Sequence, residues 1–479
     1  MNILYVTSEA VPFCKTGGLA DVAGSLPQAL AKNGDTVSVI MPLYERIVEN
    51  WGERLQFERY MYVDLAWRHA YAGLFSIEDG DVKYYFVDNE QYFKRSELYG
   101  YYDDGERFGF FSRAVVSLLP GFEEKFDVVH CNDWQSALVS VYIRDEAVRN
   151  DYYKGIKTVL TIHNIEYQGR YGRETLEDLF GLNEGWMADG TLEFDGDVNL
   201  LKGAIMTADA VTAVSPTYAE ELKYSYFAHG LDSVMNLIEG KLHGVLNGID
   251  MHRYDPKNDQ LIAAKYSVGR MTNKAKNKLA LQQTMGLEEK PDTPIIGIVS
   301  RLVSHKGLSL VCEALDYFME KDVQLVVLGK GEERFENFFN WAQQKYPGRV
   351  SVYLGYSEQL AMQIYAGADL FLMPSKSEPC GLSQMIAMRY GTVPIVRETG
   401  GLKDTVRAYE AWNGEGNGFS FADFNAGDMC HVICEAIDLY HNNQKAYKTL
   451  RKRGMQADFS WEHSAKRYRE IYDTILGAN

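Results

Sequence analysis

The chain has 479 residues, of which 46% are hydrophobic and 24% charged, a composition typical of globular proteins and a length too great for one ordinary core. We therefore expect two or three domains. The 49 basic and 66 acidic residues give a net charge of −17, which disfavours nonspecific nucleic-acid binding because the mean field repels phosphates. No stretch approaches the roughly 20 apolar residues of a membrane span, so we expect no membrane partner.

The chain begins with a strand pattern rather than with a targeting signal. Neither a basic stretch with an apolar core nor a Ser/Arg-rich transit segment precedes Ile3-Leu4-Tyr5-Val6. The six cysteines include no CxxC pair, a spacing typical of reduced thiols rather than of disulfides or a zinc site. We therefore expect a cytoplasmic protein. Cys14 and Cys380 flank glycine loops, a position that does not by itself decide whether they are reactive.

A βαβ unit is predicted at the start of the chain. The strand at 3–6 is followed by helical spacing over 20–30 and by a second apolar strand at 36–41. The first turn reads Lys15-Thr16-Gly17-Gly18, and its glycines let a ligand approach the backbone at a helix N-terminus, where unpaired N–H groups favour an anion. A plain glycine turn with an exposed lysine is the alternative. The motifs GxGxxG at this turn and GxxxxGK[ST] anywhere are absent, which argues against a dehydrogenase or a P-loop kinase.

The region from 58 to 108 is expected to lie beside this parallel core. Residues 58–88 alternate between apolar and polar, which predicts antiparallel strands. Residues 92–108 are dense in aromatic and charged side chains, which predicts a loop that contacts something or a surface flap.

Two DxD triplets raise the question of a metal site. The triplet at 79–81 lies in a predicted turn, and the triplet at 195–197 precedes a helical run at 198–207, where an acid is ordinary helix capping. Neither neighbourhood supplies enough converging acids to ligate a metal ion.

Polar side chains follow two predicted strands of the N-terminal half. The strand at 127–130 runs into Cys131-Asn132-Asp133-Trp134, and the strand at 157–162 runs into His163-Asn164-Ile165. Ligands bind at the carboxyl ends of strands in α/β sheets. A substrate contact and a purely structural histidine are therefore both open for His163.

A second series of strands begins after Pro291. The polar, irregular tract at 254–273 is typical of a crossing between domains. Beyond it, apolar runs alternate with helical segments, which predicts a second doubly wound domain. The predicted strands are 295–299, 324–328, 350–353, 369–373 and 392–396.

Three loops of this second domain follow predicted strands. One carries Arg301 and Lys306, five residues apart, and another places Glu378 just before a predicted helix at 382–390. The third is a double-glycine turn, Glu398-Thr399-Gly400-Gly401-Leu402. Cations and exposed backbone N–H groups at one sheet edge predict a diphosphate site. Solvated side chains explain one such loop but are a poor explanation for all of them.

These motifs together resemble the bacterial glycogen synthases and plant starch synthases, and the similarity spans the whole chain. It rests on Lys15-Thr16-Gly17-Gly18-Leu19-Ala20-Asp21-Val22, Thr161-Ile162-His163-Asn164-Ile165, Val245-Leu246-Asn247-Gly248-Ile249-Asp250, Ser300-Arg301-Leu302 with Lys306-Gly307, and Glu378-Pro379-Cys380-Gly381-Leu382.

The resemblance implies an α/β GT-B fold, with two Rossmann-like domains facing across a deep cleft. It implies transfer of glucose from ADP-glucose to the non-reducing end of an α-1,4-glucan, with retention of configuration and no metal or other cofactor. We expect an N-terminal domain at 1–246, a nucleotide-sugar domain at 247–458 that includes the linker, and a C-terminal helix in 459–479 that packs back on the N-terminal domain.

The resemblance also implies roles for individual residues. Arg301 and Lys306 would neutralise the diphosphate, Glu378 would meet the sugar hydroxyls or the developing positive charge, and His163 would bind the transferred glucose. We group these four as catalytic. The expected donor-binding residues are Lys15, Thr16, Gly17, Gly18, Asp21, Asn247, Tyr356 along the adenine, Ser383, Thr399, Gly400 and Gly401. The expected acceptor-binding residues are Glu9, Asp133 and Asn164, and no metal ligand is expected.

Position 386 departs from the broader retaining GT-B pattern, in which a second Glu follows the first by eight residues. The chain has Ile386 there, which leaves open how the ribose is contacted. No second acid matches the placement of Glu378, so attack by the acceptor hydroxyl on the front face, without a covalent intermediate, is favoured over a glycosidase-like double displacement. Two other functions remain as alternatives: transfer from UDP-glucose to a small acceptor, and non-catalytic glucan binding. The sequence does not indicate an oligomeric state.

Overall fold

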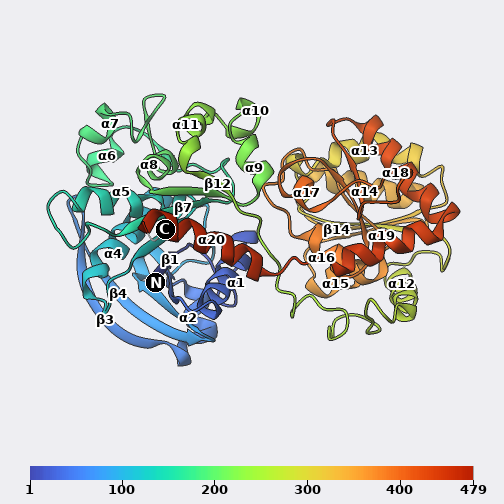
Figure 1. Ribbon diagram of the computed structural model, residues 1–479, viewed down its shortest axis with the longest axis horizontal. Coiled ribbons are helices and arrows are strands. Elements are labelled where there is room, and N and C mark those ends of the chain that lie inside the picture. Colours follow the sequence, from blue (N-terminus) through green and yellow to red (C-terminus); the bar gives the residue numbers. More distant parts are fainter. Residues whose placement is uncertain (478–479) are drawn as a thin grey trace. The chain divides into compact units, whose positions relative to one another are not determined.

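The computed structural model describes residues 1–477, which form two compact units (Figure 1). The N-terminal unit comprises Met1–Gly248 and the helix that begins at Trp461, and the C-terminal unit comprises Ile249–Ser460. The chain thus passes from one unit to the other at Gly248 and Ile249, where the sequence placed the boundary at 246, and it passes back at Ser460, where the sequence placed it at 458.

The N-terminal unit is built on one nine-stranded sheet. Its strands are β1 (Asn2–Val6), β2 (Thr36–Pro42), β3 (Gln56–Leu65), β4 (Arg68–Asp79), β5 (Val82–Asp88), β6 (Val128–Asn132), β7 (Lys157–Ile162), β11 (Ala210–Ala213) and β12 (Leu242–Gly244). They lie in the order β12-β11-β7-β6-β1-β2-β5-β4-β3. The pairs are parallel from β12 to β5, and β4 and β3 add antiparallel strands, which confirms the expectation for 58–88.

Helices of this unit connect the parallel strands. They are α1 (Gly18–Lys32), α2 (Glu45–Trp51), α3 (Glu90–Phe93), α4 (Asp104–Leu118), α5 (Ala137–Glu146), α6 (Thr175–Asp178), α7 (Gly185–Ala188), α8 (Leu200–Thr207), α9 (Pro216–Glu221), α10 (Ser225–Ala228), α11 (Asp232–Leu237) and α20 (Trp461–Leu476). A small sheet adds β8 (Arg170–Tyr171), β10 (Asp197–Asn199) and β9 (Glu193–Phe194).

Helix α1 shows why the predicted βαβ start folds as it does. Its buried residues include Leu19, Val22, Leu26 and Leu30, the spacing of one helix face. Gly24 lies inside this helix, and a Cβ there would lie 2.4 Å from a methyl group of Val11. The close approach of the preceding loop therefore outweighs the roughly 1 kcal/mol that glycine costs inside a helix.

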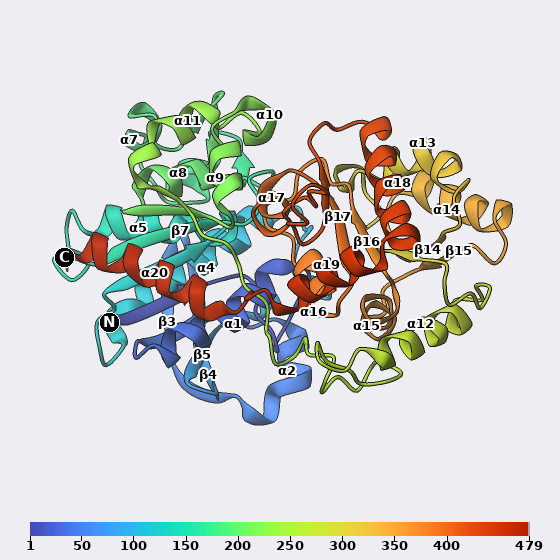
Figure 2. The ribbon, with the colours of Figure 1, turned by 45° about the vertical axis from the view of Figure 1, so that its right-hand side comes forward.

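Helix α20 lies along α1, as Figures 1 and 2 show. The Tyr472 hydroxyl contacts Nδ1 of the fully buried His130 at 2.7 Å, and Nε2 of that ring contacts the Thr161 hydroxyl at 2.6 Å. Arg469 pairs with Asp35 at 2.6 Å. Polar contacts to the centre of the sheet thus hold α20 in addition to its apolar face.

The C-terminal unit has a second, all-parallel sheet. Its strands are β13 (Ile295–Val299), β14 (Gln324–Gly329), β15 (Val350–Leu354), β16 (Leu370–Met373), β17 (Val393–Arg397) and β18 (Phe419–Phe421), in the order β15-β14-β13-β16-β17-β18. Five of these confirm the predicted strands to within one residue at each end, and β18 was not predicted. Such doubly wound sheets bury both faces of their strands, which explains the continuous apolar runs.

Helices cover both faces of this second sheet (Figures 1 and 2). They are α12 (Thr272–Thr284), α13 (Leu308–Phe318), α14 (Glu333–Lys345), α15 (Glu358–Gly367), α16 (Ser383–Arg389), α17 (Gly400–Thr405), α18 (Ala426–Asn442) and α19 (Gln444–Gln456). Helices α13, α14 and α18 lie on one face, and α12, α15 and α16 lie on the other.

The surface-flap alternative for residues 92–108 was wrong, because they include part of α3 and the start of α4, and Arg107 is fully buried with bonds to the carbonyls of Tyr92 and Leu98. The other alternative, a loop with contacts, fits the stretch between these two helices, where Arg95 pairs with Asp103 at 2.8 Å. The prediction that the acids of the triplet at 195–197 cap a helix was wrong, because Asp195 lies between β9 and β10, Asp197 begins β10, and the side chain of Asn199 caps α8 instead.

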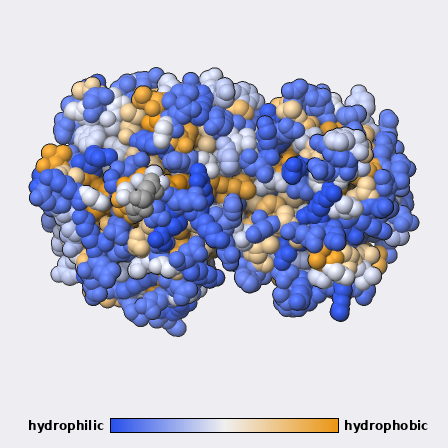
Figure 3. Space-filling view, viewed as in Figure 1, coloured by the Kyte–Doolittle hydropathy of each residue, from blue (hydrophilic) through white to orange (hydrophobic). Residues whose placement is uncertain are grey.

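Two searches of residues 1–477 bear on membranes and metals. No helix in that range combines the length and the apolar character needed to cross a membrane. The same residues contain no group of three or more His, Cys, Asp or Glu side chains placed to hold a metal ion. Figure 3 shows hydrophilic residues over most of one face, with hydrophobic residues in small groups.

The buried contact between Tyr472 and His130 predicts a stability loss. Tyr472→Phe removes the hydroxyl and leaves a buried ring nitrogen unpaired, so the free energy of unfolding should fall by about 1–3 kcal/mol. Urea unfolding of the variant and of Tyr317→Phe, a matched change at an exposed tyrosine of α13, measures this loss. Equal unfolding free energies for the two variants would show that the contact adds nothing.

Candidate active site

The turn between β1 and α1 carries the first group of predicted site residues. The buried Glu9 carboxylate accepts hydrogen bonds from the Thr16 backbone N–H at 2.5 Å and from its hydroxyl at 2.7 Å. Lys15 Nζ lies 2.6 Å from Asp21 Oδ2, in the first turn of α1. Burial raises the pKa of Glu9, and the Thr16 bonds oppose that shift only in part. The structure therefore brings Glu9, Lys15, Thr16 and Asp21 together in one hydrogen-bonded turn.

The glycines of this turn are not required by the fold around them. A Cβ on Gly18 would meet no atom within 4 Å, and a Cβ on Gly17 would meet only a Glu9 oxygen, at 3.8 Å. Neither residue has a positive φ. Since the chain itself does not need glycine here, the small residues are consistent with the close approach of a ligand.

The ends of β6 and β7 place His163 beside Asn132. His163 Nε2 lies 2.9 Å from Asn132 Oδ1, which also accepts a hydrogen bond from the Tyr5 hydroxyl at 2.8 Å. Burial lowers the pKa of His163 to about 3, so its imidazole is neutral at physiological pH. A neutral imidazole at this position can contact a ligand through hydrogen bonds but not through charge.

Asp133 shapes the loop that carries His163. It has φ 53°, and its Oδ1 accepts hydrogen bonds from the backbone N–H of His163 at 2.7 Å and of Asn164 at 3.4 Å. Burial raises the pKa of Asp133 to about 7, although these two bonds oppose the shift. Asn164 in turn accepts the Glu166 N–H at 3.0 Å. Both predicted acceptor residues of this loop therefore hold its backbone.

Asn247 has an unused acceptor. Its side chain is buried, and within residues 1–477 its Oδ1 has no hydrogen-bond partner. A buried carbonyl oxygen normally finds a donor. An external hydroxyl would supply one.

In the C-terminal unit, Glu378 and Lys306 form a buried ion pair. Lys306 Nζ lies 2.9 and 2.7 Å from the two carboxylate oxygens, and the Ser375 hydroxyl donates to Oε2 at 2.9 Å. Glu378 is only 7% exposed, and burial alone would raise its pKa. The charge of Lys306 and the hydrogen bonds from Lys306 and Ser375 outweigh that burial and lower the pKa, so the carboxylate is ionised.

Glycines allow the loops around this pair to pack. A Cβ on Gly307 would lie 1.8 Å from the Pro374 carbonyl oxygen, one on Gly400 would lie 2.0 Å from that of Glu378, and one on Gly401 would lie 2.1 Å from that of Cys380. The Gly401 N–H also donates to the Glu378 carbonyl at 3.2 Å. The second double-glycine turn therefore differs from the first, because here the chain itself fills the space.

The other predicted residues of this unit lie around the same sheet edge. Arg301 is exposed, and its guanidinium forms no hydrogen bond or ion pair with any part of the chain that the structure describes. Tyr356 is 82% exposed after β15, Ser383 begins α16 and bonds to Tyr365, and Thr399 is the N-cap of α17. Ile386 is buried in α16.

Two residues that position the site were not predicted. Asn132 ends β6 and Ser375 lies two residues beyond β16, so the sequence could indicate that both lie at the sheet edge. Their partners were not, because a hydrogen bond to His163 or Glu378 depends on how separate loops meet. Cys14, next to the first turn, is buried, and burial raises its thiol pKa to about 12, which makes it unreactive.

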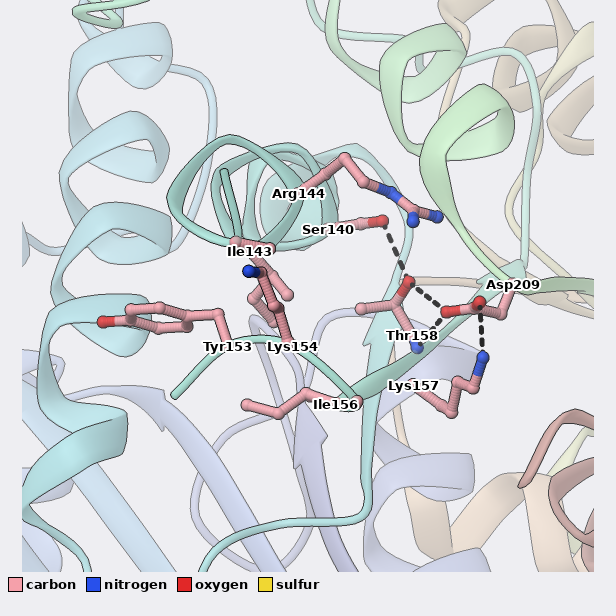
Figure 4. A pocket seen from close by; sticks show the side chains of 11 residues that line it. Ser140, Ile143, Arg144, Tyr153, Lys154, Ile156, Lys157, Thr158 and Asp209 are labelled. Carbon is pink, nitrogen blue, oxygen red and sulfur yellow. Dashed lines mark hydrogen bonds and ion pairs between the residues drawn. The ribbon is translucent and has the colours of Figure 1, made fainter. Parts of the chain in front are cut away.

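A cavity elsewhere in the N-terminal unit does not belong to this site. It lies at the start of β7 and is lined by residues of α5, by the loop that precedes β7 and by Asp209 (Figure 4). Arg144 donates to the Thr207 carbonyl at 2.9 Å, and Lys157 pairs with Asp209 at 3.3 Å. Arg144 and Lys157 therefore serve the end of α8 and the start of the strand, at the sheet edge opposite His163, and the third cation, Lys154, pairs with Asp151.

Comparison with known proteins identifies relatives along the whole chain. Residues 2–237 match the model of the starch synthase catalytic domain, and residues 283–456 match that of glycosyl transferases group 1. The chain is 48% identical over 476 residues to glycogen synthase of Bacillus cereus strain ATCC 10987, covering 99% of this chain and 100% of the relative. It is 47% identical over 479 residues to glycogen synthase of Anoxybacillus flavithermus, covering 100% and 99%.

Solved structures agree with these sequence relatives. The catalytic domain of starch synthase IV from Arabidopsis thaliana bound to ADP and acarbose superposes with a TM-score of 0.91 and 32% identity, covering 99% of each chain. A sucrose-phosphate synthase from Thermosynechococcus elongatus, at 18% identity and a TM-score of 0.61 over the full length of both chains, shares the fold alone. These likenesses confirm the predicted GT-B fold class.

A glycine-to-alanine substitution should affect stability differently in the two double-glycine turns. Gly18→Ala should leave the unfolding midpoint unchanged because its new methyl group meets open space. Gly401→Ala should lower the free energy of unfolding by about 1–3 kcal/mol, because the methyl group overlaps the Cys380 carbonyl. Thermal and urea unfolding of both variants tests this contrast, and an equal loss in the two would contradict it.

Proposed function

The chain belongs to the glycogen synthase and starch synthase family of glycosyltransferases, and from this premise we propose that it transfers glucose from ADP-glucose to the non-reducing end of an α-1,4-glucan. The configuration at the anomeric carbon is retained. The observation that carries the proposal is the 48% identity to a glycogen synthase, which extends over 476 residues and so includes the strand-end loops of both units. The bound ADP and acarbose of the starch synthase IV structure support the same donor and acceptor classes.

The leaving group determines what Arg301 and Lys306 do. Breaking a glycosyl–phosphate bond builds negative charge on the departing ADP, and preorganised cations stabilise that charge. Arg301 is exposed and its guanidinium is unengaged within residues 1–477, so all five of its N–H donors are available to phosphate oxygens. Lys306 is already fixed by Glu378, so it meets the diphosphate with little loss of side-chain entropy.

Glu378 acts on the sugar side of the same bond. Its ionised carboxylate faces the positive charge that develops at the anomeric carbon, or accepts from the sugar hydroxyls. Its contacts to Lys306 and Ser375 hold it in place through the reaction. We assign it no covalent role, because retention by double displacement needs a nucleophile and a separate acid.

The N-terminal unit supplies one cation, Lys15, together with backbone N–H groups and neutral side chains. Lys15 and the N–H groups of Gly17 and Gly18 contact the donor, with Asp21 and Glu9 holding their turn. His163 and Asn247 meet sugar hydroxyls. Asn164 is the remaining direct acceptor contact, while Asp133 acts through the backbone that it holds.

The C-terminal unit completes the nucleotide contacts. Tyr356 lies along the adenine, and Ser383 and Thr399 with its two glycines contact the phosphates and ribose. No metal ion takes part in this scheme, because the cationic side chains carry the charge stabilisation.

The defining experiment is incubation of the full chain with ADP-glucose and glycogen. Release of ADP with growth of the glucan establishes the reaction. Parallel assays with UDP-glucose and with small acceptors distinguish this reaction from the transfer of glucose from UDP-glucose to a small acceptor. Glycogen binding without turnover of any donor would instead identify a glucan-binding protein.

The cations of the C-terminal unit should be essential for turnover. Arg301→Ala and Lys306→Ala are each expected to lower kcat by at least about 100-fold, the scale of losing one preorganised charge partner. Arg301→Ala should leave stability unchanged, because the guanidinium has no bond within residues 1–477. Lys321→Ala, which breaks an exposed pair with Asp438, is the matched control. Near-normal turnover in either test variant would refute these roles.

Lys306→Ala also leaves the buried Glu378 carboxylate without its cationic partner, which should lower stability. The double variant Lys306→Ala with Glu378→Gln removes that charge, so it should recover stability but not turnover.

Glu378→Gln alone should separate binding from chemistry. The amide keeps the shape but not the charge, so kcat should fall by about 100-fold or more while ADP affinity changes little. Steady-state kinetics and calorimetric titration with ADP measure the two effects. A large loss of ADP affinity would make Glu378 a nucleotide ligand instead.

A further inference from the structure

We infer that Asn132 is a positioning residue that fixes one tautomer of His163, with Nε2 protonated and Nδ1 bare, so that the ring accepts a hydrogen bond from a substrate hydroxyl. The tautomer follows from contacts within the chain. The identity of the hydroxyl as one of the transferred or accepting sugar rests on the proposed function.

The orientation of the Asn132 amide is determined by its neighbours. One end of the side chain lies 3.0 Å from the Val6 carbonyl oxygen, which only accepts hydrogen bonds, so that end is the NH₂ group. The other end is therefore Oδ1. It receives the Tyr5 hydroxyl at 2.8 Å, which agrees with this assignment.

The orientation of the amide then determines the proton on the ring. Oδ1 only accepts, so His163 Nε2, at 2.9 Å, must donate to it and must carry a proton. Burial lowers the pKa of the ring to about 3, so the ring carries only one proton. Nδ1 is thus a bare acceptor, and it forms no hydrogen bond to any of residues 1–477.

The ring cannot easily leave this arrangement. Asn132 is fully buried, its backbone N–H contacts the Ser136 hydroxyl, and it pairs in register with Thr161 at the ends of β6 and β7. The His163 backbone N–H is held by Asp133 at 2.7 Å. Both residues of the pair are therefore fixed through the backbone as well as the side chain.

The chemical consequence is a restriction on the substrate. A neutral imidazole with a bare Nδ1 neither protonates a leaving group nor stabilises its negative charge. It accepts from a hydroxyl, so the sugar oxygen that it contacts must be a donor. Replacing that hydroxyl by fluorine, which cannot donate, should cost as much as replacing it by hydrogen.

The first test reads the tautomer directly. In histidine-labelled protein, the ¹⁵N signals of His163, assigned by their loss in His163→Gln, should show a protonated Nε2 and a bare Nδ1 that do not titrate between pH 5 and 8. In Asn132→Ala the signals should move toward a mixture of tautomers. A protonated Nδ1 in the unaltered protein, or unchanged signals in Asn132→Ala, would overturn the inference.

The second test measures turnover. Asn132→Ala should lower kcat by about 10- to 100-fold with a smaller change in KM, the scale of a misplaced catalytic contact. Asn236→Ala, at an exposed asparagine that bonds only backbone carbonyls, should not lower it. If Asn132→Ala fails to fold, Tyr5→Phe, which removes one of the two donors to Oδ1, provides the graded variant, with a smaller loss and an intact tautomer. A loss in Tyr5→Phe with a mixed tautomer would assign the positioning to Tyr5 instead.

Donor analogues complete the design. ADP-glucose analogues with one sugar hydroxyl replaced by hydrogen or fluorine should include one position where both replacements lower kcat/KM equally and where the loss disappears in His163→Ala, which has no side-chain acceptor. A fluoro analogue that matches the natural donor at every such position would overturn the acceptor role. The ¹⁵N measurement needs no turnover, so an inactive protein with the expected tautomer would refute the proposed function and leave the Asn132 assignment standing.

Discussion

The ion pair of Lys306 with the buried Glu378 is the interaction on which the edge of the C-terminal sheet depends. A carboxylate that is 7% exposed is costly unless a cation and further donors surround it, and removing one partner of such a pair typically costs about 3–5 kcal/mol. The loops that carry Lys306 and Glu378 can approach each other only where no side chain intervenes. Gly307 and Gly400 meet this requirement, because a Cβ on Gly307 would overlap the Pro374 carbonyl and a Cβ on Gly400 would overlap the Glu378 carbonyl. The glycines of these loops are therefore consequences of a buried charge pair.

The strand-end loops of the two units carry different kinds of polar groups. The N-terminal edge is built mainly from hydrogen bonds, with a neutral His163 and a turn closed on Glu9, and the Lys15–Asp21 pair is its charged element. The C-terminal edge is built from charge, with Lys306 paired and Arg301 unengaged within the described chain. A hexose is a neutral set of hydroxyls and a nucleoside diphosphate is an anion, so the N-terminal edge has groups that suit the first and the C-terminal edge has cations that suit the second.

Much of this was predictable because the pattern is local. Buried parallel strands read as apolar runs, and the residues just after them, such as Lys306, Glu378 and His163, lie at the sheet edge by topology alone. What the sequence could not give depends on contacts between distant segments. The surface-flap alternative for residues 92–108 stayed open because their charges are visible in sequence, whereas the carbonyls that satisfy the buried Arg107 are not. For the same reason Gly17-Gly18 and Gly400-Gly401 read alike, and only the surrounding atoms distinguish an open turn from a packed one.

Three buried carboxylates show how partners, rather than burial, decide where charge resides. Glu9 and Asp133 receive only N–H and hydroxyl donors, and burial raises the pKa of both. Glu378 is as deeply buried, but Lys306 reverses the shift and lowers its pKa. Glu378 is therefore the one of the three whose partners favour the ionised form more strongly than burial opposes it. A fixed negative charge stabilises a developing positive one, so the pair with Lys306 suits Glu378 to the role that we propose for it at the anomeric carbon.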